Sequence, residues 1–400
     1  MDISMTAPTL SSPLLQAFDQ QDKLFASAFP VLQEAITQRT FPAASIAVTH
    51  RGRLVALKAF GRFTYDASAP PFSRSLREEP ALRLSKGGDV DFPVTVTTLF
   101  DLASLTKVVA TTPMAMLLYE RGLLDLDAPV SAIVPEFTTD AARDPRRHEV
   151  TLRMLLAHSS GLPAYEKLFL KARTRAELLQ AAFTTPLATS PSTCAEYSDI
   201  GFIILGIALE RLADEPLGRF CQREIIAPLA MTTTTFNPPT EIHARIPPTA
   251  NDQTFRLRII QGEVQDENAF VLGGVAAHAG LFSTAADLAK FAHAMLSAGR
   301  PILRPETVAL FTRRQSAPAG TTRALGWDTP STPSQSGQYF SPQSFGHLGY
   351  TGTSLWIDPT RQLSITLLTN RTWPDCSNPA IKQIRPKFHD AVIEALEKSA

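Results

Sequence analysis

Ser104 and Lys107, three residues apart, form the pattern in this sequence with the clearest potential for chemistry. If both lie in one helical turn, their side chains share a face, and the amine can take the proton of the hydroxyl. That role requires a lysine that is neutral part of the time, which burial favours by lowering its pKa. The flanking residues 100–118 are largely apolar, which predicts a buried helix. The alternative is a helix-capping serine beside a lysine whose ammonium reaches the surface.

Four segments in order along the chain contain these two residues and further polar ones. They read Leu99-Phe-Asp-Leu-Ala-Ser-Leu-Thr-Lys107, Leu155-Leu-Ala-His-Ser-Ser-Gly-Leu-Pro163, Glu196-Tyr-Ser-Asp199 and Phe345-Gly-His-Leu-Gly-Tyr-Thr-Gly352. They resemble the nucleophile segment, the loop after it, and the second and third motifs of class C β-lactamase-like serine hydrolases. That family includes penicillin-binding proteins and related esterases. The resemblance implies that Ser104 is acylated, that Lys107 is the base, and that no cofactor or metal is needed.

The second motif supplies Tyr197 and Asp199. Tyr197 is expected to pass a proton between Lys107, the Ser104 hydroxyl and the leaving group, provided that neighbouring cations lower the pKa of its phenol. A buried tyrosine that only hydrogen-bonds at the start of the next helix is the alternative. Asp199 stands where the family commonly has asparagine. We expect it either to keep Lys107 charged, which would oppose its use as a base, or to cap the helix that begins near Ile200.

The third motif has His347 where the family usually has lysine. Its imidazole is expected to donate to Tyr197 or to a substrate carboxylate, and it supplies positive charge only when protonated. A structural histidine is the alternative. Gly349 is expected to let the substrate lie against the strand edge. The backbone N–H groups of Ser104 and Tyr350 are expected to form the oxyanion hole that stabilises a tetrahedral intermediate.

Two segments between the second and third motifs resemble a subgroup of penicillin-binding-protein-like hydrolases associated with cell-wall fragments. They read Asp266-Glu-Asn-Ala and Gly273-Gly-Val-Ala-Ala-His-Ala-Gly-Leu-Phe-Ser-Thr284. Asp266 and Glu267 are expected either to line the cleft near a cationic or amide group of the substrate or to lie in a solvated loop. His158 and His278 are expected to fasten backbone groups, as loop histidines commonly do.

The apolar spacing predicts the elements that must position these residues. Residues 14–38 have helical spacing, and Pro30 is expected to bend or split that helix. Residues 44–60 predict a β-hairpin with a glycine turn. The helix over 104–121 is expected to kink at Pro113. Further helices are expected over 152–156, 175–182, 201–212 and 386–398, and strands over 353–357 and 363–368.

This order of elements predicts an α/β fold of the α+β type. An antiparallel sheet, flanked by helices, is built from both chain ends, and an all-helical lobe is inserted between them. We expect residues 1–100 and 270–400 to form the sheet domain and residues 101–269 the mainly helical domain, with the active site between the two. Residues 66–94 are rich in proline and charge, which predicts a long surface excursion.

The composition excludes several classes of partner. Lysine plus arginine equals aspartate plus glutamate at 38 each, so no net charge would recruit nucleic acid or an anionic membrane. Cys194, Cys221 and Cys376 lack the spacing of a disulfide framework or zinc site. The first thirty residues contain no apolar run of the length of a signal sequence or membrane span, which predicts cytoplasmic residence. A periplasmic location stays open if the natural chain has a leader, and the oligomeric state is open.

The predicted activity is hydrolysis through an acyl-enzyme on Ser104, with D-alanyl peptides, muropeptides or β-lactam-like amides as substrates. Two alternatives stay open. One is a short-chain carboxylesterase, since a serine, lysine and tyrosine centre attacks activated esters. The other is a non-catalytic module that binds muropeptides or β-lactams. The chain lacks the Gly-x-Ser-x-Gly motif, which disfavours an α/β-hydrolase esterase. In each case the partner is a small molecule or peptide.

Overall fold

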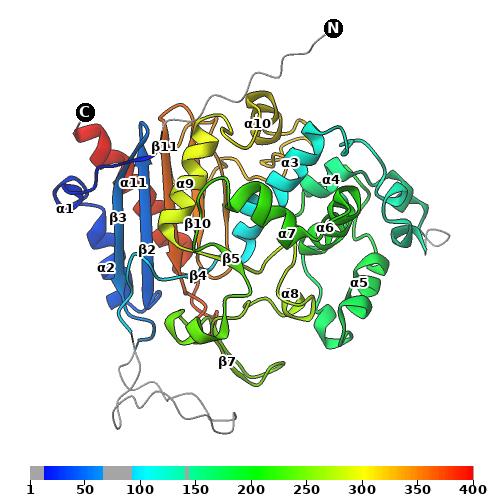
Figure 1. Cartoon of the computed structure of the whole chain (residues 1–400), viewed down its shortest axis with the longest axis horizontal. Coiled ribbons are helices and arrows are strands. Elements are labelled where there is room, and N and C mark those ends of the chain that lie inside the picture. The colour runs from blue at the N-terminus through cyan, green and yellow to red at the C-terminus, as the bar shows by residue number, and fades with distance from the viewer. Residues whose placement is uncertain (1–12, 66–91, 140–143, 400) are drawn as a thin grey trace.

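The computed structural model describes residues 13–65, 92–139 and 144–399, so residues 66–91 of the expected surface excursion lie outside the described residues (Figure 1). Both ends of the chain build a six-stranded sheet with the strand order β1-β3-β2-β11-β10-β9. β1 runs parallel to β3, and the other neighbours are antiparallel. The strands are β1 (Leu15–Gln16), β2 (Ala43–His50), β3 (Arg53–Gly61), β9 (Phe345–Leu348), β10 (Ser354–Asp358) and β11 (Leu363–Thr369). The predicted sheet, built from both chain ends, is confirmed.

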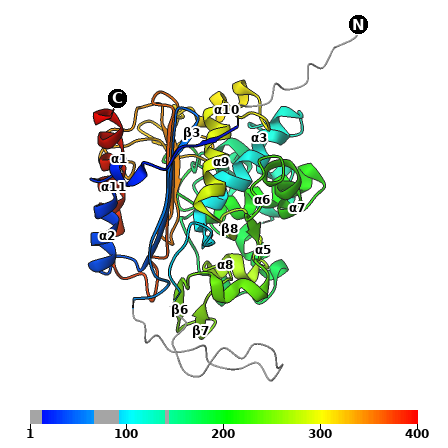
Figure 2. The same cartoon turned by 60° about the vertical axis from the view of Figure 1, so that its left-hand side comes forward.

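Helices cover both faces of this sheet because alternate side chains of its strands are apolar on each side. On one face, Val48 of β2 packs in a core with α2 (Phe29–Thr37) and α11 (Ile381–Lys398). Its neighbour Ala47 belongs to a second core, shared with α9 (Ala285–Leu296) on the other face. Figure 2 shows α2 and α11 on one side of the strands and α9 on the other. The sheet is therefore a buried middle layer.

Most of the helices that do not cover the sheet come from the middle of the chain (Figure 1). Several of them pack around α6 (Asp199–Ala213), which is buried along most of its length. The others are α3 (Thr112–Glu120), α4 (Leu152–Leu156), α5 (Arg175–Thr184), α7 (Leu217–Cys221), α8 (Glu267–Val271) and α10 (Pro305–Thr312). A three-stranded sheet has the order β4 (Phe100–Asp101), β8 (Leu281–Ser283) and β5 (Thr235–Phe236), and a second small sheet pairs β6 (Ala250–Asp252) with β7 (Arg258–Ile260). None of the helices in the described ranges is long and apolar enough to cross a membrane.

The helix predicted over residues 14–38 is wrong at its start, whereas its expected split near Pro30 is observed. Leu15 and Gln16 form β1, which lies beside β3, and two separate helices follow, α1 (Gln21–Leu24) and α2. Pro30 lies in the first turn of α2. A proline is tolerated there because the first N–H groups of a helix have no intrahelical acceptor. The proline therefore starts a helix instead of bending one.

The helix predicted over residues 104–121 changes its winding along its length. It begins as a 3₁₀ turn over Ala103–Leu105, widens to a π-helical turn over Lys107–Thr111, and becomes regular only in α3. Pro113 lies in the first turn of α3. The wide turn lies directly before Pro113, whose missing N–H cannot take part in the regular hydrogen-bond pattern of a helix. This local unwinding is also what positions the two reactive side chains at its start.

Candidate active site

Ser104 lies directly after β4, in the first turn of the helix that leads into α3. Ala103, just before it, has a φ of 46°, in the left-handed region that non-glycine residues rarely adopt. The buried Asp101 carboxylate holds this turn, because it accepts from the N–H of Ala103 at 2.8 Å and from that of Gln265 at 2.7 Å. The strained turn brings the serine hydroxyl to the Nζ of Lys107, which donates to it at 3.0 Å.

Lys107 is fully buried, and its Nζ is surrounded by oxygen atoms. Besides the Ser104 hydroxyl it contacts the Tyr197 hydroxyl at 2.6 Å, Asp199 Oδ1 at 2.6 Å and the backbone oxygen of His278 at 3.0 Å. An ammonium has only three N–H groups for these four oxygens. A neutral amine would instead accept a hydrogen bond from one of the hydroxyls. The surroundings can therefore hold either protonation state of the lysine.

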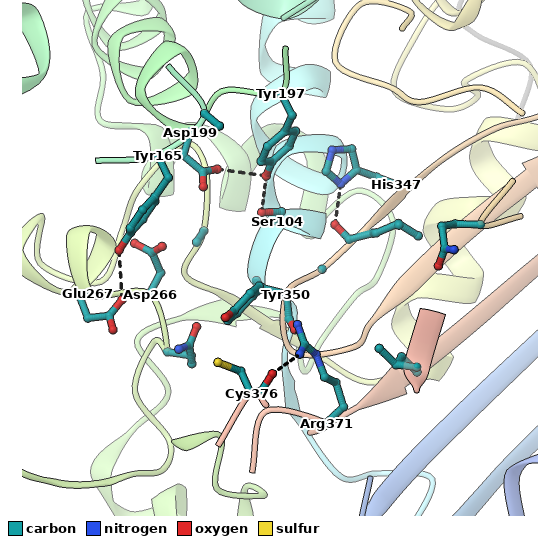
Figure 3. Close-up of a pocket in the computed structure, with 18 of the residues that line it drawn as sticks. Ser104, Tyr165, Tyr197, Asp199, Asp266, Glu267, His347, Tyr350, Arg371 and Cys376 are labelled. Atoms are coloured by element: carbon teal, nitrogen blue, oxygen red, sulfur yellow. Dashed lines mark hydrogen bonds between the residues drawn. The ribbon is translucent and has the colours of Figure 1, made fainter. Parts of the chain in front are cut away.

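Tyr197 completes the group of proton-transferring side chains. Its hydroxyl lies 2.6 Å from Ser104 Oγ and 3.0 Å from Asp199 Oδ1. Figure 3 shows the side chains of Ser104 and Asp199 meeting at the hydroxyl of Tyr197. The structure thus brings together four of the predicted residues, and a proton can move from the serine to the lysine directly or through the phenol.

The start of α6 positions Tyr197 and Asp199. Ser198, not Asp199, caps this helix, since its Oγ accepts from the N–H of Gly201 at 3.0 Å. The capping alternative for Asp199 is therefore wrong. His158 Nδ1 accepts from the N–H of Ser198 at 3.0 Å, and its ring packs on that of Tyr197 with 4.8 Å between centroids. His158 thus fastens the backbone, as expected.

His347, on β9, is buried beside this group but makes no hydrogen bond to Tyr197, and the two ring centroids are 5.9 Å apart. Its Nδ1 donates to the backbone oxygen of Leu348 at 2.7 Å, and its Nε2 has no partner among the described residues. Burial, then Lys107 and Arg323, hold the pKa of His347 well below its ordinary value. The expected hydrogen bond to Tyr197 is absent, whereas the expected contact of His347 with a substrate carboxylate stays a prediction.

Gly349 and Tyr350 follow β9 at the edge of the site. A Cβ at Gly349 would lie 2.5 Å from the backbone oxygen of Leu102, behind the nucleophile turn. The glycine is thus required by this close contact, and because it also lines the cavity, its expected role of letting substrate lie against the strand edge stays a prediction. The Tyr350 side chain lines the cavity, and its N–H has no acceptor in the described part of the chain. The N–H of Ser104, in a first helical turn, also lacks an intrahelical acceptor.

Asp266 and Glu267 lie at the start of α8 and line the same cavity, so they are not part of a solvated loop. Asp266 caps α8 and contacts His278 Nε2 at 2.9 Å, which is a fastening role for that histidine. Burial works against ionisation, but His278 and the cap hydrogen bond hold the pKa of Asp266 below its ordinary value. Glu267 accepts from the Tyr165 hydroxyl at 3.3 Å, and burial raises the pKa of its carboxyl.

These residues surround a cavity of about 940 Å³ whose lining carries both acidic and basic side chains. Figure 3 shows Asp266 and Glu267 on one side of Tyr350 and Arg371 on the other. The basic lining residues escaped the sequence analysis because isolated arginines and lysines have no recognisable spacing. They are Lys167, Arg323, Arg371, Lys382 and Arg385. Within residues 13–65, 92–139 and 144–399, no group of three histidine, cysteine or acidic side chains is placed to hold a metal ion.

Comparison with known proteins places this geometry in a family. The beta-lactamase family model matches residues 22–384. The chain belongs to the beta-lactamase family. An Escherichia coli (strain K12) protein, provisionally named D-alanyl-D-alanine carboxypeptidase, is 32% identical over 373 residues, which cover 85% of this chain and 80% of that protein.

Solved structures share the fold of this beta-lactamase family member. EstCE1, described as a hydrolase with promiscuous acyltransferase activity, has a TM-score of 0.71 at 20% identity, covering 93% of this chain and 99% of its own. A class C beta lactamase from Rhodobacter sphaeroides has a TM-score of 0.66 at 21% identity, covering 94% and 99%. Together with the family match, they identify the protein as a serine hydrolase of the beta-lactamase type.

In this beta-lactamase family site, the pKa values of Lys107 and Tyr197 shift in opposite directions. Burial lowers the pKa of Lys107, although the Asp199 carboxylate opposes the shift. Burial, and then Asp199, raise the pKa of Tyr197 well above its ordinary value. The expectation that cations lower the phenol pKa is therefore wrong for the resting site. The phenol stays protonated, and it can relay a proton only by giving up its own as it takes that of Ser104.

Replacing Asp199 with asparagine is expected to move the acid limb of the pH profile to lower pH. The negative charge of Asp199 raises the pKa of Lys107, so its removal lowers that pKa further. Because the base acts when deprotonated, activity is lost as the pH falls through the pKa of Lys107. The measurement is kcat/KM against pH for a neutral p-nitrophenyl ester. Asp127→Asn, an exposed control, should leave the profile unchanged. A limb displaced to higher pH would contradict Lys107 as the base.

Proposed function

We propose that this beta-lactamase family hydrolase cleaves peptides that end in D-alanine, including muropeptides, through an acyl-enzyme on Ser104. Ser104 Oγ attacks the carbonyl carbon of the terminal peptide bond while its proton passes to Lys107, directly or through Tyr197. The backbone N–H groups of Ser104 and Tyr350 stabilise the oxyanion. The proton then goes to the leaving amine, D-alanine departs, and water releases the acyl group.

The observation that carries the choice of substrate is the guanidinium of Arg323 beside the reactive group. Its Cζ lies 5.6 Å from the centre of the Tyr197 ring, and its side chain is 20% exposed. Its one acidic contact among the described residues is with Asp328, at 3.7 Å, so much of its hydrogen-bonding capacity is open to the cavity. A carboxylate one residue beyond the scissile bond would find its positive charge here, since His347 is neutral. The carboxypeptidase name of the Escherichia coli relative agrees with this substrate.

A panel of acyl donors tests the proposal. Release of D-alanine from a peptide ending in D-alanyl-D-alanine is compared with turnover of nitrocefin and of p-nitrophenyl butanoate. We expect the peptide to be hydrolysed, and Ser104→Ala to abolish its hydrolysis. Turnover of the ester alone would make the protein a carboxylesterase. Binding of the peptide without any turnover would make it a binding module. Either result contradicts the proposal.

Arg323→Gln is expected to lower kcat/KM for the D-alanyl peptide by about 10- to 100-fold relative to kcat/KM for the neutral ester, mainly through KM. A charge-assisted contact with a carboxylate contributes about 1.5–3 kcal/mol, and each 1.4 kcal/mol is tenfold. Arg361→Gln, on the surface away from the cavity, is the matched control and should leave the ratio unchanged. An unchanged ratio in Arg323→Gln would remove Arg323 from the carboxylate site.

A further inference from the structure

A second set of basic side chains lines the cavity at a distance from the proton-transferring group. Arg371 follows β11, and Lys382 and Arg385 lie near the start of α11. Figure 3 shows Arg371 across Tyr350 from Asp266 and Glu267. None of the three takes part in the chemistry proposed for Ser104, so their presence in the cavity wall needs another explanation.

Arg385 is the least favourably placed of the three because its charge is buried without a counter-ion. The residue is 3% exposed, Nη1 donates to Gln335 Oε1 at 2.8 Å, and Nε has no partner among the described residues. No acidic side chain of the described residues forms an ion pair with it. Burial of an unpaired cation is unfavourable, and proteins usually offset it with an opposite charge. Burial, then Arg371, lower the pKa of Arg385 to about 9, so the group remains largely charged at neutral pH.

Arg371 is held in a fixed orientation close to Arg385. Its Nε donates to the backbone oxygen of Tyr350 at 2.8 Å and its Nη1 to that of Cys376 at 3.3 Å. Its guanidinium also lies over the Tyr350 ring, 4.6 Å from the centroid. These partners are carbonyls and a ring, so its charge is not neutralised. Lys382 adds a third, exposed cation, and no ion pair neutralises it within the described residues.

We propose that Arg371, Lys382 and Arg385 bind an anionic group, a carboxylate or a phosphate, in the acyl part of the substrate. The inference rests on the proposed function, in which Arg323 holds the carboxylate of the leaving group. Guanidinium groups suit either anion because they donate two parallel hydrogen bonds. The carboxylates of Asp266 and Glu267 repel an anion from the opposite wall. In this arrangement the anionic end of an acidic acyl chain lies at Arg371 and Arg385.

The test uses p-nitrophenyl esters of straight-chain acids in three matched series, whose far ends carry a methyl, a carboxylate or a phosphate group. We expect the best charged ester to exceed its neutral counterpart in kcat/KM by about tenfold. Arg385→Gln should remove most of this preference, and the exposed Lys382→Gln should reduce it severalfold. Lys387→Gln, on the same helix and 61% exposed, should leave it unchanged. A preference for the carboxylate esters alone identifies an acidic peptide as the source of the anion. A preference for the phosphate esters alone identifies a phosphorylated fragment.

Equal rates for all three series in the unmodified protein would overturn the inference, as would a preference that survives both Arg385→Gln and Lys382→Gln. If no ester is turned over, the subsite is tested by binding instead, while the proposed function is judged separately by release of D-alanine from the D-alanyl peptide. Glutarate and inorganic phosphate are then titrated into Ser104→Ala protein by calorimetry. Binding to the Ser104→Ala protein that is lost when Lys382→Gln is added to it supports the subsite. No binding of either anion overturns it.

Discussion

Lys107→Met is expected to reduce kcat/KM for acyl donors by roughly 10³-fold, the contribution typical of a positioned general base. Methionine fills a similar volume, so the helix from Ala103 to Glu120 keeps its packing while the amine is lost. Asp199 loses its partner, but its side chain is 14% exposed towards the cavity and can be hydrated. The measurement is steady-state hydrolysis of the D-alanyl peptide and of a neutral ester, with thermal unfolding to verify the fold.

Lys290→Met is the matched control, because Lys290 is a partly exposed lysine on α9. It should retain full activity. A Lys107→Met protein that unfolds normally and keeps activity within tenfold of the unmodified protein would show that the lysine is structural.

Tyr197→Phe is expected to lower kcat/KM by about 10²- to 10³-fold. The substitution removes the hydroxyl that contacts Ser104 Oγ and Lys107 Nζ but keeps the ring that packs on His158. We expect single-turnover acylation to slow while the fold is unchanged. Tyr119→Phe, at a partly exposed site that packs on Phe311, serves as the control. Equal acylation rates for Tyr197→Phe and the unmodified protein would favour a merely structural tyrosine.

Local patterns account for what the sequence could predict. Ser104 and Lys107 are three residues apart, so their contact follows from one helical turn. The hairpin of β2 and β3 follows from alternating apolar residues around Arg51 and Gly52, which both adopt positive φ values of 50° and 76°. The motif around Tyr197 and Asp199 was recognisable through its resemblance to a family. Each of these signals lies within a few residues of the chain.

Other features depend on contacts between distant segments and had no local signal. The apolar spacing of residues 14–38 is helical, yet Leu15 and Gln16 pair with β3, because an edge strand is set by its neighbour. The pKa of Tyr197 depends on burial and on the carboxylate of Asp199, and these became visible only in three dimensions. Arg323 and Arg385 are isolated basic residues in the sequence, and only the fold places them in one cavity.

The irregular winding of the helix that begins at Ala103 positions the reactive side chains. Asp101 holds the strained turn at Ala103, and the 3₁₀ and π turns that follow direct the side chains of Ser104 and Lys107 towards the start of α6. There the phenol of Tyr197 meets both of them. Positioning of this kind converts weak groups into a nucleophile and its base without a cofactor in the proposed steps.

Mass spectrometry of the acyl-enzyme tests the central claim most directly. The protein is incubated with a fluorescent penicillin and, separately, with an activated ester, then quenched and digested. We expect a mass increase equal to the acyl group on the peptide that contains Ser104, and no increase in Ser104→Ala. An adduct that persists in Ser104→Ala, or no adduct from any donor that is turned over, would contradict the assignment of Ser104 as the nucleophile.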